Sequence, residues 1–576
     1  MAASISPSVS VFMTQMSSYI NQHNLSTETL FQPETAATVG NIIFTHKWLI
    51  GTAIFALVAA IRLFHYFFIH DQPPRGSGLK LIPGPLSTIP YIGRVHDVDP
   101  NAPWFAMKKF CDQYDGVFRN TICGEMHIWV GRQDLAAELL CKKARIYSSR
   151  PMVPAVPGSD SQGQYLPLLA HDDHWRKQRK FAHTVLTASF NSKYYGYVSH
   201  EAKRFLYKLL VDPKDHFALT DRYCGRIAAR LGYGSPNSAA AHCKNAGEFI
   251  PQISPSGSIT NLMPFLGSLP EWLNPSVRMV RERREKEEKL WKGLMKQVTL
   301  EMDKGPVPIS YARAYFERKE AESGSRSFGF DDHEAAYAVG MLVTVAIFTI
   351  GGPLYCFFLA MVLHPEWQEK VRKEYDEVIG DRVVEVSDAP NLPVLRAAIK
   401  ECIRWRPAVP LGVPRLLEED DEWRGYYLPK GAVIHAVDLA MARDPEKYPD
   451  ADNYRPERWL EPEWPTFQEP LTQYPTLMGH HGFGMGRRMC VGIELTEAEL
   501  LVACGSIIGC FELKPEVDQN GQPLWPDDWA FTPNLIGGPL PFKMDVKVRS
   551  AQKAERIRHW YEESVADEAA GKVQHY

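Results

Sequence analysis

A single cysteine near the C-terminal end of the chain has the surroundings of a metal ligand. The segment from Phe483 to Gly492 reads FGMGRRMCVG, so glycines flank Cys490, and an apolar helical pattern follows. This pattern predicts a glycine-shaped loop that ends at the N-terminus of a helix. At such a position the helix dipole and free N–H groups lower the pKa of a thiol, and the thiolate is the form that binds metal. The competing interpretation is a buried, inert cysteine.

The rest of the ten cysteines carry no comparable pattern. No two of them form a C-x-x-C pair, so neither a zinc site nor a redox dithiol is indicated. Disulfide frameworks belong to small secreted domains, whereas this chain has 576 residues. We therefore expect the other thiols to be buried, reduced and inert.

Three further segments combine arginine with tryptophan or glutamate. Trp175 and Arg179 are four residues apart, which places both on one face of a predicted helix. Glu401 and Arg404 are three residues apart and also share a helix face. A later segment, YRPERW, contains Arg458. Taken alone, charged pairs of this kind are usually solvated.

In this order, the segments resemble the motifs of the cytochrome P450 family, from about residue 80 to about residue 545. The cysteine loop is similar to the haem-binding loop of that family, F-G-x-G-x-R-x-C-x-G. It matches this pattern at Phe483, Gly484, Gly486, Arg488, Cys490 and Gly492. The resemblance implies a mainly α fold with small β-sheets, the cytochrome P450 fold. It also implies haem b, iron protoporphyrin IX, as the cofactor, with Cys490 as the ligand of the metal.

The resemblance also implies roles for the other motif residues. Glu401, Arg404 and Arg458 correspond to a buried charge network that supports the haem loop. Contacts with haem are implied for the loop and for residues that reach the propionates, namely Cys490, Phe483, Gly484, Gly486, Arg488, Trp175, Arg179 and Arg415.

The activity that the resemblance implies is that of a fungal-type microsomal monooxygenase. A thiolate ligand favours cleavage of the O–O bond of dioxygen. Electrons would come from NADPH-cytochrome P450 reductase, and the substrate would be a small, largely apolar metabolite of secondary metabolism. A group of basic residues is either a docking face for the reductase or a solvated surface. It comprises Arg176, Lys177, Arg179, Lys180 and Arg487.

The helix expected over the haem departs from the family pattern. Counted back from His364, the acid–threonine pair of the family aligns with Phe348 and Thr349. Thr349 is therefore the expected catalytic residue, but phenylalanine cannot relay protons. This difference favours a second hypothesis, a P450 that dehydrogenates, couples or rearranges its substrate without net oxygen insertion. A third hypothesis, a non-catalytic haem sensor, fits less well because Thr349 is retained.

The same region, residues 331–366, has a long apolar stretch with two interpretations. Its length allows a second membrane span. We favour a buried core helix, because the sequence Gly-Gly-Pro at residues 351–353 interrupts the stretch. Phe348 on this helix, together with Leu411 and Val413 further along the chain, is expected to line the substrate pocket.

An N-terminal segment predicts a membrane anchor. Residues 48–69 read WLIGTAIFALVAAIRLFHYFFI, a run just long enough to cross a bilayer as a helix. A cleaved signal peptide would begin closer to residue 1. The excess of Lys and Arg after the run places the C-terminal bulk in the cytoplasm. We therefore expect a single-pass protein of the endoplasmic reticulum membrane, with residues 1–47 in the lumen and a glycosylation sequon at Asn24.

The remaining sequence completes the expected organisation. A proline-rich linker at 70–95 precedes a cytochrome P450 catalytic domain at 96–548 and a charged tail at 549–576. The formal net charge is -4 and no strongly basic domain stands out, so nucleic-acid binding is not expected.

Overall fold

The computed structural model describes part of the chain, namely residues 51–52, 55–58, 72–86, 89, 92–94, 99–255, 257–263, 266–267, 269–272, 274–322 and 327–574. The chain divides into two compact units, Met1–Gly78 and Leu79–Tyr576. Asn24 and most of the predicted span 48–69 lie outside the described residues. Within that span, residues 51–52 and 55–58 are helical and exposed.

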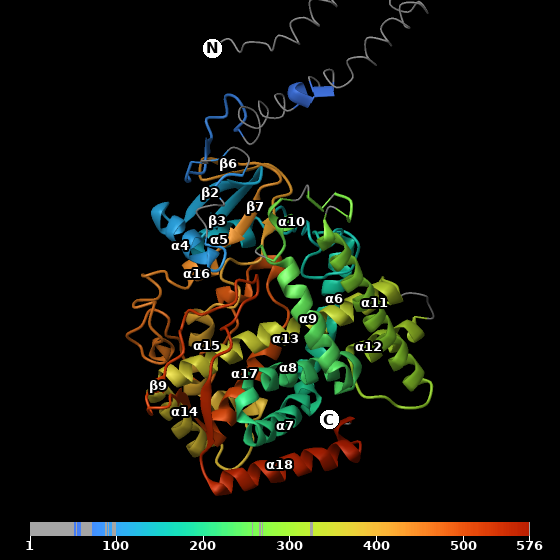
Figure 1. Cartoon of the computed structure of the whole chain (residues 1–576), viewed down its shortest axis with the longest axis vertical. Helices are drawn as coiled ribbons and strands as arrows, with labels where there is room; N and C mark the ends of the chain where they lie inside the picture. The colour runs from blue at the N-terminus through green and yellow to red at the C-terminus, as the bar shows by residue number, and fades with distance from the viewer. Residues whose placement is uncertain are drawn as a thin grey trace, which may run out of the picture. The chain divides into compact units, whose positions relative to one another are not determined.

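The larger unit is mainly helical with small sheets, which confirms this part of the predicted fold (Figure 1). Its α-helices are α4 (Pro103–Gln113), α5 (Gln133–Ala137), α6 (Asp173–Asn191), α7 (Tyr197–Val211), α8 (His216–Tyr233), α9 (Ala239–Ile253), α10 (Ile259–Leu262), α11 (Pro275–Met302), α12 (Tyr311–Ala321), α13 (Asp332–Leu363), α14 (Pro365–Val378), α15 (Pro393–Trp405), α16 (Asp438–Met441), α17 (Ile493–Cys510) and α18 (Ala551–Ala569). Local sequence signals determine where several helices begin. The side chains of Asp172 and Asp331 cap the N-termini of α6 and α13, and Pro393 is the first residue of α15.

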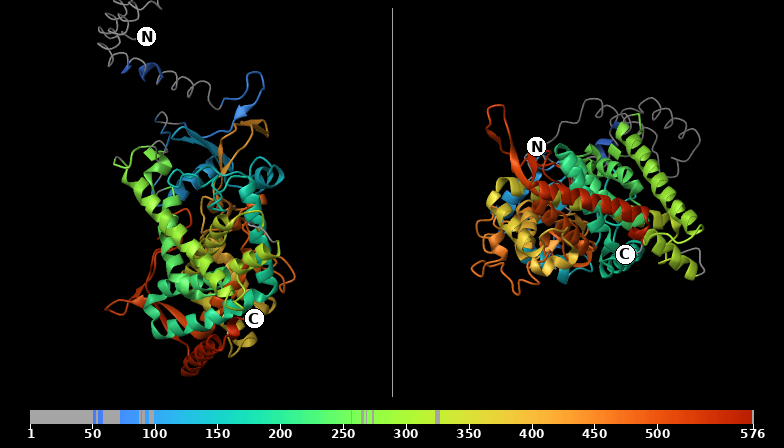
Figure 2. Two further views of the ribbon diagram at one scale, coloured as in Figure 1. Left: turned by 90° about the vertical axis from the view of Figure 1, so that its right-hand side faces the viewer. Right: turned by 90° about the horizontal axis from the view of Figure 1, so that it is seen from below.

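The strands of the described residues form three small sheets. They are β1 (Lys80–Leu81), β2 (Val117–Ile122), β3 (Glu125–Val130), β4 (Arg415–Leu416), β5 (Asp421–Trp423), β6 (Tyr426–Leu428), β7 (Val433–Ala436), β8 (Phe511–Val517), β9 (Pro523–Leu524) and β10 (Met544–Val548). The sheet that matters for the site has the order β2-β3-β7-β4; β3 runs parallel to β7, with His127 opposite Val433. This sheet lies at one end of the larger unit, and α7 and α18 lie at the other (Figures 1 and 2).

Helix α13 runs through the core of the larger unit. It packs against α8, α11, α15 and α17, and most of its side chains are buried. Among the described residues it is the one helix long and apolar enough to cross a membrane, but 78% of its most apolar stretch is buried inside the protein. An apolar helix that protein covers on all faces needs no lipid. The interpretation as a buried core helix is therefore confirmed.

Both segments that flank the expected catalytic domain take part in the fold. Lys80–Leu81, inside the expected linker, forms β1 and pairs with β6. The charged tail forms α18, which packs on α7. There Glu568 binds Arg230 and Arg204, each over 2.6 Å. The compact unit thus begins before residue 96 and continues beyond residue 548.

Candidate active site

Cys490 lies where the cysteine loop joins α17. The loop contains two short 3-10 turns, η10 (His481–Phe483) and η11 (Gly486–Arg488). The N–H of Cys490 donates to the carbonyl of Phe483 over 2.8 Å, and the N–H of Gly492 donates to the sulfur of Cys490 over 3.3 Å. A donor to sulfur draws electron density from a thiolate, so the N–H of Gly492 tunes any bond between the sulfur and a metal.

The backbone of the cysteine loop requires glycine at two positions. Gly484 has a φ of +75° and Gly486 a φ of +59°, in the left-handed region that favours glycine. A Cβ atom on Gly486 would stand 2.1 Å from the carbonyl oxygen of Leu140, on the short π-helix η3 (Glu138–Lys142). Gly484 therefore allows the left-handed backbone of the loop, and Gly486 also lets the loop approach η3.

The pKa of the Cys490 thiol differs from the sequence-based expectation. Its side chain faces an internal cavity, which gives it open surface although protein surrounds it. Burial raises the pKa of the thiol, and the N–H of Gly492 and the guanidinium of Arg179 lower it without overcoming burial. The expected net lowering is wrong for the free thiol, because an enclosed site disfavours the charged form. A bound cation reverses this balance, since a coordinated thiol loses its proton.

The space in front of Cys490, here called the cysteine cavity, is bounded by α13 on one side and by the loop and the start of α17 on another. Its polar lining residues are Cys490, Thr349, Thr496 and Tyr311, and the rest of the lining is apolar apart from Gly492. An apolar space between a thiol and a core helix is the setting expected for a flat, largely apolar macrocycle.

Thr349 lines the cysteine cavity, whereas Phe348 does not. The hydroxyl of Thr349 donates to the carbonyl of Val345, one turn earlier, over 2.7 Å. Phe348 packs against the hydrophobic core and lines neither this cavity nor the proline-lined cavity described below. Successive residues on a helix point about 100° apart, so the two side chains cannot both face the thiol.

Arg488 and Arg415 are buried close to each other with unmet donors. Arg488 donates to the carbonyls of Ser148 and Leu169, and Arg415 donates to that of Met485. The Nη1 atom of each is buried without a protein partner. Burial, and then the charge of Arg415, lower the pKa of Arg488. These positive charges are therefore poorly compensated by the protein.

Arg150 and Arg179 complete a cluster of four arginines. Arg150 donates to the carbonyls of Val413 and Pro414 over 2.7 and 2.5 Å, and burial and the other three arginines lower its pKa well below the usual value. Arg179 donates to the carbonyl of Met489, beside Cys490. Sequence analysis missed Arg150, because no motif marks it. Asp172 and Glu418 act on Arg488 from a distance, but they do not offset burial and the charges of the other arginines. Buried cations of this kind favour a bound anion, and the two propionates of haem meet that requirement.

Trp175 lies beside this cluster, at the start of α6. Its backbone N–H donates to the capping side chain of Asp172 over 2.8 Å. The guanidinium of Arg488 lies 4.4 Å from the centre of the Trp175 ring. Because Trp175 and Arg179 are about one turn apart on α6, both reach the cysteine loop. Their predicted contact with the haem propionates stays a prediction.

Glu401, Arg404 and Arg458 meet in a fully buried network. Glu401 binds Arg404 over 2.7 and 2.9 Å and Arg458 over 3.0 Å. It also accepts the indole N–H of Trp459 over 3.0 Å and the backbone N–H of Arg455 over 2.9 Å. Both carboxylate oxygens are thus well bonded, which a buried charge requires. The network joins α15 to the YRPERW segment and lines neither cavity, so its geometry suits a structural role.

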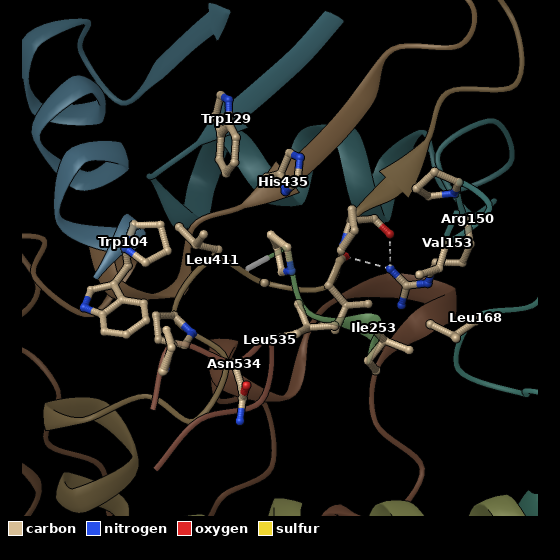
Figure 3. Close-up of a pocket in the computed structure, with 18 residues that line it drawn as sticks. Trp104, Trp129, Arg150, Val153, Leu168, Ile253, Leu411, His435, Asn534 and Leu535 are labelled. Atoms are coloured by element: carbon tan, nitrogen blue, oxygen red, sulfur yellow. Dashed lines mark hydrogen bonds between the residues drawn. The ribbon is translucent and has the colours of Figure 1, made fainter. Parts of the chain in front are cut away.

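A second space, here called the proline-lined cavity, has Arg150 of the arginine cluster in its wall (Figure 3). Its prolines are Pro103, Pro151, Pro255, Pro410, Pro414 and Pro533. Leu411 and Val413, two of the residues predicted to line the substrate pocket, line this cavity, and Arg150 lines it as well. Trp129 and His435, from β3 and β7, stack with ring centres 3.8 Å apart on one side of it. The mostly apolar lining suits a small apolar molecule.

The basic residues considered as a docking face divide into two groups. Arg176, Lys180 and Arg487 are exposed, and Lys177 is half-buried. Arg179 is turned inward onto the loop. The exposed members remain available to a partner.

The family model for cytochrome P450 matches residues 83–536. The chain is 30% identical over 492 residues to cytochrome P450 monooxygenase virE of Hypocrea virens, covering 83% of this chain and 87% of that protein. It is 31% identical over 499 residues to cytochrome P450 monooxygenase claR of Ampulloclitocybe clavipes, covering 83% and 88%. A solved zebra fish cytochrome P450 with progesterone has a TM-score of 0.65 at 21% identity, covers 78% of this chain and 99% of that chain, and shows the shared fold.

The matched region contains the cysteine loop, the four arginines and the Glu401 network. Membership of the family implies a haem-thiolate cofactor, a substrate, dioxygen and a redox partner. Together with the geometry around Cys490, the match establishes that this chain belongs to the cytochrome P450 family and is an oxidoreductase enzyme.

Proposed function

We propose that this chain is a haem-thiolate monooxygenase that oxidises a small, largely apolar metabolite of fungal secondary metabolism. The observation that carries the proposal is the presence of Cys490 beside a buried cluster of four arginines. One molecule, haem b, has both a metal that a thiolate binds and two carboxylates that the arginines would neutralise. When bound, haem supplies the activation of dioxygen.

The residues of the chain would bind this cofactor and orient the reactants. Cys490 would bind the iron of the cofactor through its sulfur, which already accepts the N–H of Gly492. The free Nη1 atoms of Arg415 and Arg488 would donate to propionates. Thr349 keeps its hydroxyl at the cysteine cavity, and because its proton is donated to Val345, its oxygen is free to accept a hydrogen bond there.

The proline-lined cavity is the proposed route and pocket for the substrate. Leu411 and Val413 lie on its wall, so their size would limit which substrates fit. Prolines have little conformational freedom, which supports a pocket with a preformed shape. Curated relatives from fungi support the assignment to fungal metabolism.

NADPH-cytochrome P450 reductase is the proposed electron donor, with Arg176, Lys180 and Arg487 as exposed cations for docking. The proposed location is the endoplasmic reticulum membrane, with a single span at 48–69 and the catalytic unit in the cytoplasm. Residues 1–47 would be luminal and glycosylated at Asn24. The exposed apolar side chains of Phe55 and Leu57 support a span at this place.

A second candidate function is dehydrogenation, coupling or rearrangement without net oxygen insertion, which Phe348 in place of an acid favours. The test is to express the gene with a reductase in a host supplied with isotopically labelled dioxygen and to compare metabolites by mass spectrometry. A gene-dependent product that carries the label would support monooxygenation. A gene-dependent product without the label would support the second candidate.

A further inference from the structure

His435 brings an unpaired polar atom to the wall of the proline-lined cavity. The residue lies on β7, and its side chain is only 8% exposed. Its Nδ1 atom is buried without a hydrogen-bond partner in the protein. Because buried nitrogen atoms in folded proteins are nearly always paired, this atom is open to a molecule bound in the cavity.

The other polar side chains of this wall are less suited to hold a ligand. Arg150 donates to three backbone carbonyls. Asn534 is half-buried, and Figure 3 shows its amide turned away from His435. The indole N–H of Trp104 is also buried without a partner, so no hydrogen bond holds that ring in place. An indole can only donate, whereas an imidazole can donate or accept.

The ring of His435 is fixed by residues of β3, the neighbouring strand. Trp129 lies opposite His435 in the pairing of β3 with β7, and the two rings stack with centres 3.8 Å apart and planes 11° apart. The indole N–H of Trp129 donates to Asn120 over 2.8 Å, which holds the stack in register. In addition, Nε2 of His435 lies 3.0 Å from Nδ1 of His127. A ring that is already fixed loses little freedom when it binds a ligand.

The contact between the two histidines gives the unpaired nitrogen two hydrogen-bonding states. Burial lowers the pKa of His127 to about 4 and that of His435 well below its usual value, so both rings are neutral near pH 7. A neutral imidazole has one N–H and one bare nitrogen. When His127 donates to Nε2 of His435, Nδ1 of His435 carries a proton and is a donor. When Nε2 of His435 donates instead, Nδ1 is an acceptor. His435 is thus suited to a carbonyl oxygen or to a hydroxyl group.

Around His435 the wall of the cavity is mostly apolar. Besides its prolines, the wall includes Val153, Leu168, Ile253 and Leu535 (Figure 3). Such a lining favours a hydrocarbon body, while the fixed imidazole favours one oxygen atom on that body. A site built to bond a polar group rejects an analogue without that group, because the buried atom of the site then stays unpaired.

The geometry points to His435 as the residue that selects and orients the substrate, through a hydrogen bond between its Nδ1 atom and a hydroxyl or carbonyl group. This inference rests on the proposed function, since it concerns the substrate of that reaction. It narrows the substrate class to largely apolar molecules that already carry an oxygen substituent. A bond at that substituent limits how the molecule can turn in the cavity, and so limits which of its carbon atoms is oxidised.

The test compares the binding of phenol and toluene to the full-length holoenzyme by calorimetry. The two probes are nearly equal in size, but only phenol has a hydroxyl group. His435→Phe keeps an aromatic ring beside Trp129 and removes both nitrogen atoms. The Kd of phenol should therefore rise about tenfold, while the Kd of toluene should stay within about twofold of the wild-type value. His435→Gln keeps a donor and an acceptor and should recover part of the affinity for phenol.

Two further variants make this comparison specific. Trp104→Phe removes the other unpaired N–H of the same wall and should change the ratio of the two Kd values less than His435→Phe does. His559→Phe, at an exposed position on α18, is the matched control and should bind both probes as the wild type does. If His435→Phe fails to fold, His435→Met takes its place, because methionine is apolar and adapts its shape to its surroundings.

A crystal structure of the wild type with phenol is the second measurement. The phenol oxygen should lie within about 3.2 Å of Nδ1 of His435. An oxygen atom placed elsewhere, no binding of phenol by the wild type, an unchanged ratio of Kd values in His435→Phe, or a larger change in Trp104→Phe would each overturn the inference.

Failure of the proposed function would look different, since probe binding requires no turnover. The wild type would then lack the thiolate-type Soret shift when reduced under carbon monoxide, or would form no product that carries labelled oxygen. The preference for phenol that depends on His435 would still be measurable in that case.

Discussion

Arg415 and Arg488 each have a buried Nη1 atom without a hydrogen-bond partner in the protein. Their other guanidinium donors bind backbone carbonyls of Met485, Ser148 and Leu169, so both heads are held in place. Two fixed, unmatched donors close to each other form a site for a molecule with two carboxylates. This pairing links the fold to the cofactor, since the arginines come from segments 73 positions apart in the numbering of the chain.

Replacing Arg488 should weaken haem binding. In Arg488→Met one charge-assisted hydrogen bond to a propionate is lost, which corresponds to about 1.5–3 kcal/mol, or a loss of affinity of about tenfold or more. The neighbouring Arg487 is exposed, so Arg487→Met is the matched control and should bind haem as the wild type does. Titration of haem into the apoprotein measures both. Equal affinities in the two variants would contradict the role of the cluster.

Replacing Cys490 should remove thiolate ligation. Cys490→Ala should lose the thiolate-type Soret shift of the reduced protein under carbon monoxide, because no other cysteine lines the cysteine cavity among the described residues. Cys141 is the other exposed cysteine of the chain, so Cys141→Ala is the control and should keep the shift. A shift that survives in Cys490→Ala would refute the ligand assignment.

Two arginines of the YRPERW segment should differ in their effect on stability. Arg458 is fully buried against Glu401, so Arg458→Ala removes one of the two arginines that compensate the buried carboxylate and should cost about 3 kcal/mol. Arg455 makes a half-exposed pair with Asp450, and Arg455→Ala should cost less than about 1 kcal/mol. Denaturant unfolding of the full chain measures both. A similar cost at the two positions would show that the network does not stabilise the fold.

Lys400 should make the stability depend on pH. Burial lowers the pKa of Lys400 from 10.5 to about 8, and its ammonium lies 4.3 Å from the centre of the Trp459 ring. Between these two pKa values the unfolded chain binds a proton that the folded chain lacks, so the free energy of unfolding rises with pH. The contribution is at most about 3 kcal/mol over this window.

The variant Lys400→Met should lack this part of the rise. The free energy of unfolding is therefore expected to increase more for the wild type than for Lys400→Met between pH 8 and pH 10, about the window that the two pKa values set. Lys373→Met, at an exposed site, should follow the wild type. Parallel curves for the wild type and Lys400→Met would show that this lysine stays charged in the fold.

Thr349 should control how dioxygen is used. Thr349→Val removes the hydrogen-bond acceptor beside the cysteine cavity, so the peroxide released per NADPH should rise by about tenfold. Thr344→Val is the control on the same helix, because Thr344 is buried beside His242 and lines neither cavity. Electron balance with reductase present measures both variants. A wild-type peroxide yield in Thr349→Val would remove Thr349 from the mechanism.

The motifs that sequence analysis identified are those whose geometry is local. The glycines of the cysteine loop need positive φ values, and Glu401 and Arg404 share a helix face, so spacing alone predicts both arrangements. The long apolar stretch also has a local explanation, since its Gly-Gly-Pro interruption favoured a core helix over a span. Phe348 shows the limit of this reasoning. The alignment predicts Phe348 in the substrate pocket, but its side chain packs against the hydrophobic core and lines neither cavity.

The sequence by itself determined the family, the metal-binding cysteine and the class of helix-rich fold, because these follow from residue types at short, regular spacings. Only the tertiary structure decided which charged groups have a hydrogen-bond or ion-pair partner and which are buried without one. Arg150 joins three other arginines from distant segments, and both carboxyl oxygens of Glu499 are buried without a hydrogen-bond partner. The raised pKa of Cys490 has the same origin. Burial and long-range electrostatics depend on what the fold packs around a group, and no local pattern in the chain contains that information.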